Sequence, residues 1–170
     1  MQRITPDKLA SWYRQLGPAV RLYVAQWINP SDAEDVVQEL FTKLTRQPRE
    51  PANVRAWLFR AARHAAVNAT RSRRRRSHHE AASALLRPAH RGTCDETSAL
   101  DAKLAQQAID QLPREQREVI VLRIWGQLEW KEIAATTGCP VSTAFSRYQR
   151  GLDAVRARLE STCTSKRTND

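Results

Sequence analysis

"LEWKEIAATTGCPVSTAFSRYQRGLDAVRARL" (residues 128–159) has the rhythm of two helices joined by a tight turn. Gly138 predicts the turn, because glycine adopts at little cost the left-handed backbone that ends many helices. Ile133 and Ala134 are expected to face inward, and the small Ala134 and Ala135 allow two helices to cross closely. The second helix is expected to bury the apolar residues that recur at helical spacing, which are Val141, Ala144, Tyr148, Leu152, Val155 and Leu159. The stretch therefore predicts a helix-turn-helix.

The other face of the second helix carries short hydroxyl, amide and guanidinium groups. These are Ser142, Thr143, Ser146, Arg147, Gln149 and Arg150. Such side chains suit phosphates and base edges in a DNA major groove. An ordinary helical hairpin with a solvated basic face has the same pattern, so the stretch alone leaves both interpretations open. Phe145 could touch a thymine methyl group, but a place in the core is the favoured interpretation.

The charge of the chain is concentrated in its middle. The 170 residues have a formal net charge of +10. Residues 1–50 contribute +1, residues 51–91 contribute +9 from ten arginines and one acid, and residues 92–170 contribute zero. A localised positive field suits a polyanion, most simply nucleic acid. An acidic membrane surface is less favoured, because no long amphipathic Lys/Phe pattern accompanies the arginines.

The N-terminal third predicts two helices. Residues 7–28 have apolar residues at helical spacing, interrupted by Gly17-Pro18. Ser31 and Glu34 form an S-x-x-E capping box that predicts the next helix start. That helix has one apolar stripe, made of Val36, Val37, Leu40, Phe41 and Leu44. Off the stripe lie Asp32, Asp35, Gln38 and Glu39, which remain available to water or to a partner.

A Pro-punctuated loop (residues 47–53) precedes a long helix that starts near Val54. One face of this helix is apolar and carries Val54, Trp57, Leu58, Ala61, Ala62 and Ala65. The opposite face carries Arg60, Arg63, Arg71 and Arg74. The arginine-rich "TRSRRRRSHHE" (residues 70–80) therefore continues an amphipathic helix and is not an isolated tail.

The pattern predicts an all-α fold of two small helical domains joined by a flexible linker. The expected boundaries are residues 1–76 for the first domain, 77–98 for the linker, 99–160 for the second domain and 161–170 for a disordered tail. Helices are expected at 99–111, 113–125, 130–137 and 141–160. Strand signals are nearly absent, and only five glycines occur in the chain.

Four sequence blocks resemble the extracytoplasmic-function (ECF) sigma factors of bacterial RNA polymerase. They are "DAEDVVQE" (32–39), "AWLFRAAR" (56–63), "LPREQREV" (112–119) and "EIAATTGCPVSTAFSR" (132–147). Their order and spacing match the family over residues 7–160. The resemblance implies two domains, region two and region four, and an alternative sigma factor that binds core polymerase, recognises the −10 and −35 promoter elements, melts the promoter and initiates transcription.

The resemblance also implies binding residues. The polymerase β′ clamp helices would be contacted by Asp32, Asp35, Val37, Gln38 and Phe41, and residues 112–128 would contact the β flap. The −10 region would be contacted by Asn53, Arg60, Arg63, His64, Asn68, Arg71, Arg73 and Arg74, beside a loop (residues 46–53) that resembles the segment capturing a flipped base. The −35 region would be contacted by Ser142, Thr143, Ser146, Arg147, Gln149 and Arg150. An anti-sigma factor is a further partner that the family implies.

Three departures from the family pattern affect the second domain. Ala144 and Phe145 stand where many members have Lys or Arg, which removes one basic contact. Glu129 replaces the usual Ser or Thr cap and is expected to weaken the helix start that follows. Gly151 lies inside a helix, at a cost of about 1 kcal/mol relative to Ala.

Other chemistry is set aside. No catalytic constellation, metal site or cofactor site is expected, because His78, His79, His90 and Cys94 match no common zinc-finger spacing. The odd, widely spaced Cys94, Cys139 and Cys163 indicate reduced thiols in a cytoplasmic protein. No membrane insertion is expected, because the sequence has no run of about 20 apolar residues. Two alternatives are weighed: a stand-alone helix-turn-helix regulator that binds duplex DNA as a dimer, and a DNA-processing enzyme such as a recombinase, for which the pattern offers no scaffold.

Overall fold

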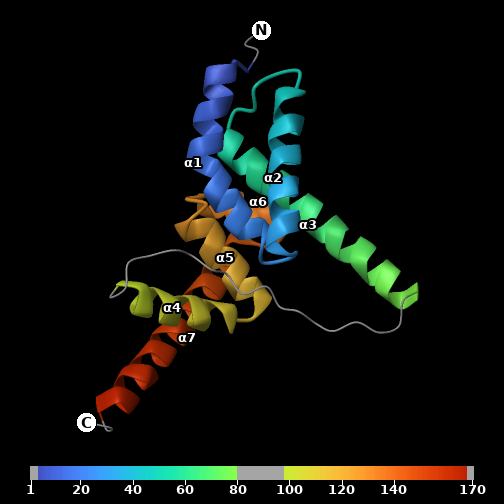
Figure 1. Ribbon diagram of the computed structural model, residues 1–170. Coiled ribbons are helices and arrows are strands. Elements are labelled where there is room, and N and C mark those ends of the chain that lie inside the picture. Colours follow the sequence, from blue (N-terminus) through green and yellow to red (C-terminus); the bar gives the residue numbers. More distant parts are fainter. Residues whose placement is uncertain (1–3, 80–97, 168–170) are drawn as a thin grey trace. The chain divides into compact units, whose positions relative to one another are not determined.

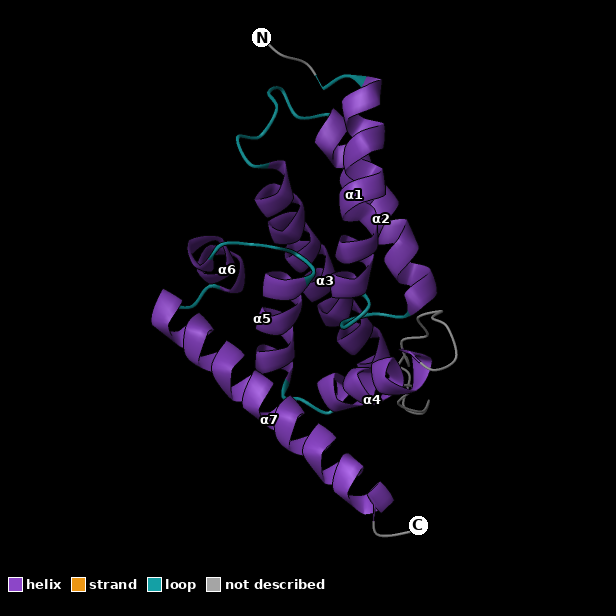
Figure 2. Cartoon of the chain, turned by 90° about the vertical axis from the view of Figure 1, so that its left-hand side faces the viewer, coloured by secondary structure: helices purple, strands orange, loops and turns teal. Residues whose placement is uncertain are grey.

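In the computed structural model, all the regular secondary structure of the described residues is α-helical. The structure describes the backbone of residues 4–79 and 98–167, and the side chains of residues 4–72, apart from Pro30, and of residues 104–160. The helices are α1 (Pro6–Val24), α2 (Pro30–Thr45), α3 (Val54–His79), α4 (Ser98–Asp110), α5 (Arg114–Ile124), α6 (Trp130–Thr137) and α7 (Val141–Arg167). Figure 2 shows helices and connecting loops, and no strand, within these ranges. No helix among the described residues is long and apolar enough to cross a membrane.

The chain divides into two compact units, the first containing α1 to α3 and the second containing α4, most of α5, α6 and α7. The all-α prediction is therefore confirmed for the described ranges. The linker predicted at residues 77–98 overlaps the end of α3, which continues to His79, and the start of α4 at Ser98, while residues 80–97 lie outside the described residues. Helix α7 continues to Arg167, past the position at which the sequence pattern predicted a disordered tail.

In the first unit, α1 and α2 lie side by side and α3 packs against both (Figure 1). The core is formed by large side chains that are fully buried: Val20, Tyr23, Val37, Leu40, Leu44, Leu58 and Phe59. The rings of Tyr23 and Phe59 meet edge to face, with centroids 5.6 Å apart. Each such side chain contributes about 1.5–3 kcal/mol by leaving water, so these contacts set the relative positions of the three helices.

Helix α1 runs through the Gly17-Pro18 pair without the interruption that the sequence pattern suggested. Pro18 lacks the N–H that would have bonded to the carbonyl of Arg14, which costs the helix one hydrogen bond. Arg14 and Pro18 are both exposed, so water can hydrate that carbonyl. Burial of Leu16, Val20 and Tyr23 on the opposite side holds the helix together across this position.

Helix α2 begins earlier than its predicted capping box. Its N-cap is Asn29 and its first residue is Pro30, so Ser31 is already inside the helix. Proline is favoured at the first helical position because its missing N–H has no partner there in any case. The N–H of Ala33 bonds to the carbonyl oxygen of Asn29 at 2.9 Å, which closes the first turn. The predicted capping role of Ser31 and Glu34 is therefore wrong. The Glu34 carboxylate instead contacts Tyr13 and Arg21 of α1.

The apolar face of α3 is rotated from its predicted position. Ala56, Leu58, Phe59, Ala62 and Ala66 are buried. In contrast, the side chains of Trp57, Ala61 and Ala65, which were expected at the centre of the core, are only half-buried. Phe59 was missed because its partner, Tyr23, comes from a helix far away in the sequence.

In the second unit, the turn between α6 and α7 forms as predicted. Gly138 has a φ of 72° and ends α6 in the left-handed conformation, and its N–H bonds to the carbonyl oxygen of Ala134 at 2.8 Å. The start of α6 is better stabilised than the sequence suggested. The Glu132 carboxylate accepts a hydrogen bond from the N–H of Glu129 at 2.8 Å, which is the reciprocal arm of a capping box. The expected weakness at Glu129 is therefore wrong.

Gly151 is a packing residue of α7. It is buried, and a Cβ at this position would lie 2.7 Å from Cδ1 of Ile120 and 3.3 Å from Cβ of Gln116, both on α5. The two helices approach this closely because Gly151 has no side chain. The helix-propensity cost predicted for glycine is therefore offset by close packing between α5 and α7.

The core of the second unit differs in part from the predicted set. Ile133 and Ala144 are buried as expected, together with Val119, Ile120 and Leu122 of α5. Two expectations are wrong: Val141 is 43% exposed, and Ala135 is exposed. Val141 opens α7 immediately after the turn, before the helix reaches the core. Thr136 and Thr137 are buried in place of Ala135. The Thr137 hydroxyl donates to the carbonyl oxygen of Ile133 at 2.8 Å, which satisfies one of these two buried polar groups.

Candidate nucleic-acid and polymerase interfaces

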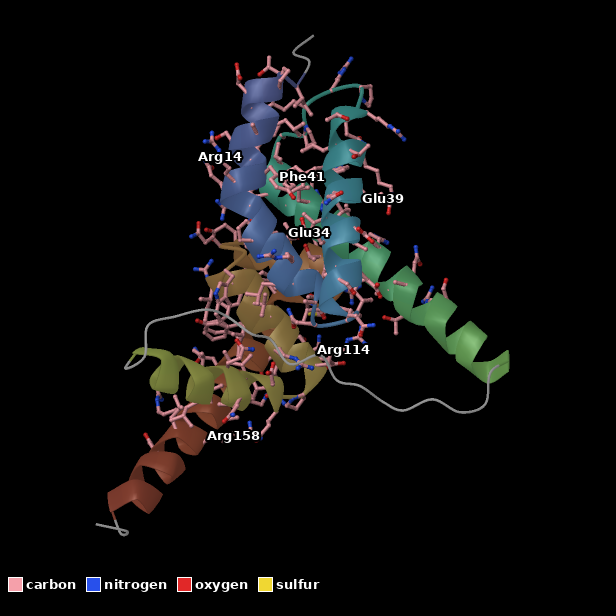
Figure 3. The ribbon with its side chains drawn as sticks, viewed as in Figure 1. Arg14, Glu34, Glu39, Phe41, Arg114 and Arg158 are labelled. Carbon is pink, nitrogen blue, oxygen red and sulfur yellow. The ribbon has the colours of Figure 1, made fainter. Side chains whose placement is uncertain are left out.

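The outer face of α2 is acidic and amide-bearing. Asp32, Asp35 and Gln38 are exposed, as the sequence pattern predicted. Val37 and Phe41, which belong to the same predicted binding set, are 1% and 4% exposed. In Figure 3 Phe41 lies between α1 and α2, whereas Glu39 points away from α1. Both residues belong to the predicted apolar stripe and fix the position of α2 from inside the core, so their burial does not support the direct polymerase contact that the family resemblance implied.

The orientation of α2 relative to α1 is also held by a polar network. The Tyr13 hydroxyl donates to Oε1 of Glu34 at 2.9 Å, and Nη1 of Arg21 lies 3.3 Å from Oε2 of the same carboxylate. The hydrogen bond to Glu34 raises the pKa of Tyr13, with smaller contributions from desolvation and from the Glu34 charge. The Tyr13 ring also meets Phe41 edge to face at 4.9 Å. Sequence reasoning missed this network, because its members lie on two helices and no local pattern pairs them.

The outer face of α3 carries a polar stripe that we call the α3 stripe. It consists of Arg60, His64, Asn68 and Arg71, all of which are exposed. Their spacing of i, i+4, i+8 and i+11 places them on one side of the helix. Arg63 is half-buried. The side chains of Arg73 and Arg74 lie outside the described residues, but the α3 backbone extends past both.

The loop before α3 ends at a capping residue. Oδ1 of Asn53 accepts a hydrogen bond from the N–H of Ala56 at 2.9 Å. Asn53 therefore satisfies one of the N–H groups at the start of α3 that have no partner within the helix. Its side chain is exposed, and Oδ1 is committed to this cap. Trp57, on the first turn, is half-buried, which fits partial core packing.

The polar face of α7 is partly occupied by its own contacts. Ser142, Gln149 and Arg150 are exposed, and Thr143, Ser146 and Arg147 are half-buried. Nη2 of Arg147 lies 2.6 Å from Oε2 of Glu115 at the start of α5. Nη2 of Arg150 donates to Oγ of Ser146 at 2.8 Å. All six predicted residues lie on α7, and each of the two arginines is engaged with another protein side chain.

Phe145 lies on this same surface and not in the core. It is 46% exposed, which makes the favoured core assignment wrong. Its ring meets Trp130 edge to face, with centroids 5.3 Å apart. The core space that Phe145 was expected to fill is reached from the same helix by Ala144, which is fully buried.

Comparison with known families matches both units. The Sigma-70 region 2 model matches residues 12–76, and the Sigma-70 region 4 model matches residues 102–155. The ECF RNA polymerase sigma-E factor of Escherichia coli is 30% identical over 154 residues, covering 81% of this chain and 78% of the relative. The chain belongs to the ECF sigma factor family. It is thus a sigma factor, the kind of protein with which RNA polymerase recognises promoters and initiates transcription.

Other sigma factors are similar in sequence and in fold. EcfG of Rhodopseudomonas palustris is 29% identical over 148 residues, covering 84% of this chain and 80% of the relative. Among solved structures, the sigma factor RpoE in complex with the anti-sigma factor NepR from Bartonella quintana matches with a TM-score of 0.68 and 25% identity, over 92% of this chain and 98% of that chain. CnrH in complex with the cytosolic domain of CnrY shares the fold, with a TM-score of 0.58 at 23% identity, over 92% of this chain and 90% of that chain.

The region 4 match places the helix-turn-helix of this sigma factor in a DNA-binding family, while the region 2 match covers both the outer face of α2 and the α3 stripe. Three of the contacts that shape these surfaces were not found from the sequence: Glu34 with Tyr13, Glu115 with Arg147, and Trp130 with Phe145. Each joins residues from two different elements. The i, i+4 signals that identify helix faces carry no information about such pairs.

Proposed function

We propose that this sigma factor binds core polymerase through the outer face of α2 and promoter DNA through α3 and α7. One observation carries the proposal: both DNA-facing helices present polar faces away from their cores, and each lies within its matched sigma region. A sigma factor needs two such surfaces because the −10 and −35 elements are separate segments of the promoter.

The polymerase contact is assigned to Asp32, Asp35 and Gln38. Their exposed carboxylates and amide suit a basic or hydrogen-bonding partner surface, for which we propose the β′ clamp helices. Val37 and Phe41 act indirectly, by holding the helix that carries these groups. Residues 112–128 are assigned to the β flap on the basis of the family resemblance.

The −10 contact is assigned to the loop of residues 46–53 and to the α3 stripe. Arginine side chains on a helix without acids give phosphate affinity, while a polar loop beside them offers room for an unstacked base. Arg63, Arg73 and Arg74 extend the same contact along the helix. Asn53 contributes mainly by starting α3, and its exposed side chain belongs to the same assigned surface.

The −35 contact is assigned to the polar face of α7. The first two turns of the second helix in a helix-turn-helix face base edges in the major groove. Ser142, Thr143 and Gln149 suit that role, and Arg150 lies where the helix meets the phosphates. Arg147 contributes once its ion pair with Glu115 opens or extends to DNA.

An anti-sigma factor is proposed as a regulatory partner, because the family resemblance implies one and the similar sigma factor RpoE was solved in complex with the anti-sigma factor NepR. We also propose that the chain acts in the cytoplasm, where polymerase and promoter DNA are found, and that it regulates transcription without catalysing a reaction of its own.

The test is reconstitution with bacterial core polymerase. The purified chain is expected to bind core enzyme and to direct specific initiation from promoters of its own genome, measured by run-off transcription. A chain that binds duplex DNA as a dimer and never associates with core enzyme would instead be the stand-alone regulator. In that outcome the sigma proposal is wrong.

The polymerase contact has a sharper test. The double variant Asp35→Lys with Gln38→Lys should lose core binding in a pull-down or mass-photometry assay while retaining its helical circular dichroism, because both residues are exposed. The matched control is Asp7→Lys with Gln15→Lys, which makes the same charge change at exposed positions of α1. Equal binding by the two double variants would remove α2 from the polymerase interface.

A further inference from the structure

The first two turns of α7 expose apolar groups among polar ones. Val141 and Phe145 are 43% and 46% exposed and lie one turn apart, flanked by the exposed Ser142 and Gln149. A single exposed apolar residue is common on protein surfaces and needs no explanation. Val141 and Phe145 differ from such isolated residues in their position, because the start of the second helix is the part of a helix-turn-helix that contacts base edges.

The Phe145 ring is held in place from behind. It packs edge to face on Trp130, and Trp130 in turn meets Tyr148 edge to face at 5.3 Å. The guanidinium carbon of Arg123 lies 5.0 Å from the Trp130 ring centroid. Edge-to-face and cation–π contacts each add a favourable interaction beyond burial. One side of Phe145 is therefore packed against protein, while its other side remains accessible.

The arginines on this face are engaged with protein groups. Arg147 makes its ion pair with Glu115, and Arg150 bonds to Ser146. Specific recognition of guanine by arginine requires two N–H groups directed at the base edge. In the observed arrangement each guanidinium has an N–H group engaged with a protein atom, and Phe145 is the largest exposed apolar side chain in the first two turns of α7.

We propose that Phe145 is a specificity-determining residue that contacts the 5-methyl group of a thymine in the −35 element. Among the four DNA bases only thymine carries a methyl group in the major groove, and apolar side chains recognise it by contact. The inference rests on the proposed function, because it requires α7 to read the −35 element. It adds to the proposed function the base that is recognised at one position of the −35 element and the side chain that recognises it.

The first experiment defines the DNA probe. Core polymerase carrying the full chain is used to select duplexes from a library with a randomised −35 segment and a constant −10 segment. The wild-type protein is expected to enrich thymine at one position of one strand. Deoxyuridine is then placed at that position, which removes the methyl group and retains base pairing. Binding should weaken about fourfold, the effect expected for one buried methyl-sized group.

Variants at Phe145 identify the residue that senses the methyl group. Phe145→Ala should bind the thymine and deoxyuridine duplexes equally and should lose the thymine preference in the selection. Phe145→Leu keeps an apolar side chain and should retain part of the discrimination. A thymine in the −10 segment replaced by deoxyuridine is the control, and its effect should be the same for all three proteins. Circular dichroism melting establishes that each variant is folded.

Three results would overturn the inference. The first is a −35 selection in which no position depends on the thymine methyl group. The second is a methyl dependence that persists unchanged in Phe145→Ala. The third is the absence of any enriched −35 sequence, which would remove the proposed role of α7 as well. The first two leave that role intact, so failure of the inference can be separated from failure of the proposed function.

Discussion

Helices α3 and α7 are nearly equal in length and carry the two candidate DNA faces, but they differ in how charge is arranged on them. Helix α3 contains eight arginines and no acid in 26 residues. Helix α7 contains six basic and two acidic residues in 27, and Arg147 is paired with an acid from α5. The α3 stripe therefore presents uncompensated positive charge, whereas the α7 face presents hydroxyl, amide and aromatic groups beside engaged arginines.

This difference separates affinity from selectivity. Uncompensated arginines attract any phosphate backbone and give binding that depends strongly on salt. Hydroxyl, amide and aromatic groups at fixed positions distinguish one base from another, and the binding energy that they contribute depends less on salt. We therefore expect α3 to dominate the strength of promoter binding and α7 to dominate the choice of sequence.

The largest expected effect comes from removing charge from the α3 stripe. Arg60→Gln with Arg71→Gln should lower the slope of log affinity against log salt by about 1.4–1.8, because two phosphate contacts are lost. Promoter binding by the reconstituted holoenzyme at 0.1 M salt should weaken by tens of fold by the same relation. Fluorescence anisotropy over a salt series measures both quantities.

The matched control for the stripe is Arg14→Gln with Lys43→Gln. It removes the same charge from exposed positions of α1 and α2. Its salt slope should stay close to that of the wild type. If the two double variants have the same salt slope, promoter binding depends on the total charge of the protein. The proposed difference between α3 and α7 would then be wrong.

A smaller effect is expected at the contact between α5 and α7. In Gly151→Ala, better helix propensity contributes about 1 kcal/mol. The clash with the buried Ile120 costs about 1–3 kcal/mol, because a well-packed core yields little. The clash should prevail, and the second unit should lose up to about 2 kcal/mol of unfolding free energy. Hydrogen exchange of α5 and α7 measures the loss, with α1 to α3 as an internal reference.

The second change Ile120→Val tests the cause of that loss. It removes Cδ1, the atom that would lie 2.7 Å from the new Cβ. Gly151→Ala should therefore be better tolerated in the Ile120→Val background than in the wild type. If Gly151→Ala lowers the unfolding free energy equally in both backgrounds, the glycine is needed for the backbone conformation of α7 and not for its packing against Ile120.

The smallest effect is expected at Glu115. Glu115→Gln releases Arg147 from its ion pair, so the guanidinium can turn toward a phosphate. Because Glu115 is largely exposed, the pair contributes at most about 1 kcal/mol. Promoter binding should strengthen a few-fold, and the salt slope should rise by up to about 0.9, the value for one phosphate contact.

The control for Glu115 is Asp153→Asn on α7. Asp153 is paired with Arg156 at 3.7 Å, and both side chains are exposed. The substitution makes the same change in net charge but lies more than two turns after Phe145. It should alter the salt slope less than Glu115→Gln does. A larger effect at Asp153 would move the DNA contact toward the C-terminal part of α7.

The parts of the fold that depend on neighbouring residues were predictable. Helix α6 begins and ends at the predicted residues, since Gly138 acts within its own turn. The exposure of Asp32, Asp35 and Gln38 and that of the α3 stripe follow from helical periodicity in the same way. The start of α2 was missed by one or two residues because Pro30 and Ser31 give competing local signals.

The sequence by itself determined the helices, the polar faces and the family, since all three are carried by residues a few positions apart along the chain. Only the tertiary structure decided that Glu34 accepts a hydrogen bond from Tyr13 and that Phe145 faces outward. It also decided that Ile120 packs closely against Gly151 and that Glu115 forms an ion pair with Arg147. The reason is physical: each of these outcomes depends on how closely a second helix approaches, and periodicity along one helix contains no measure of that distance.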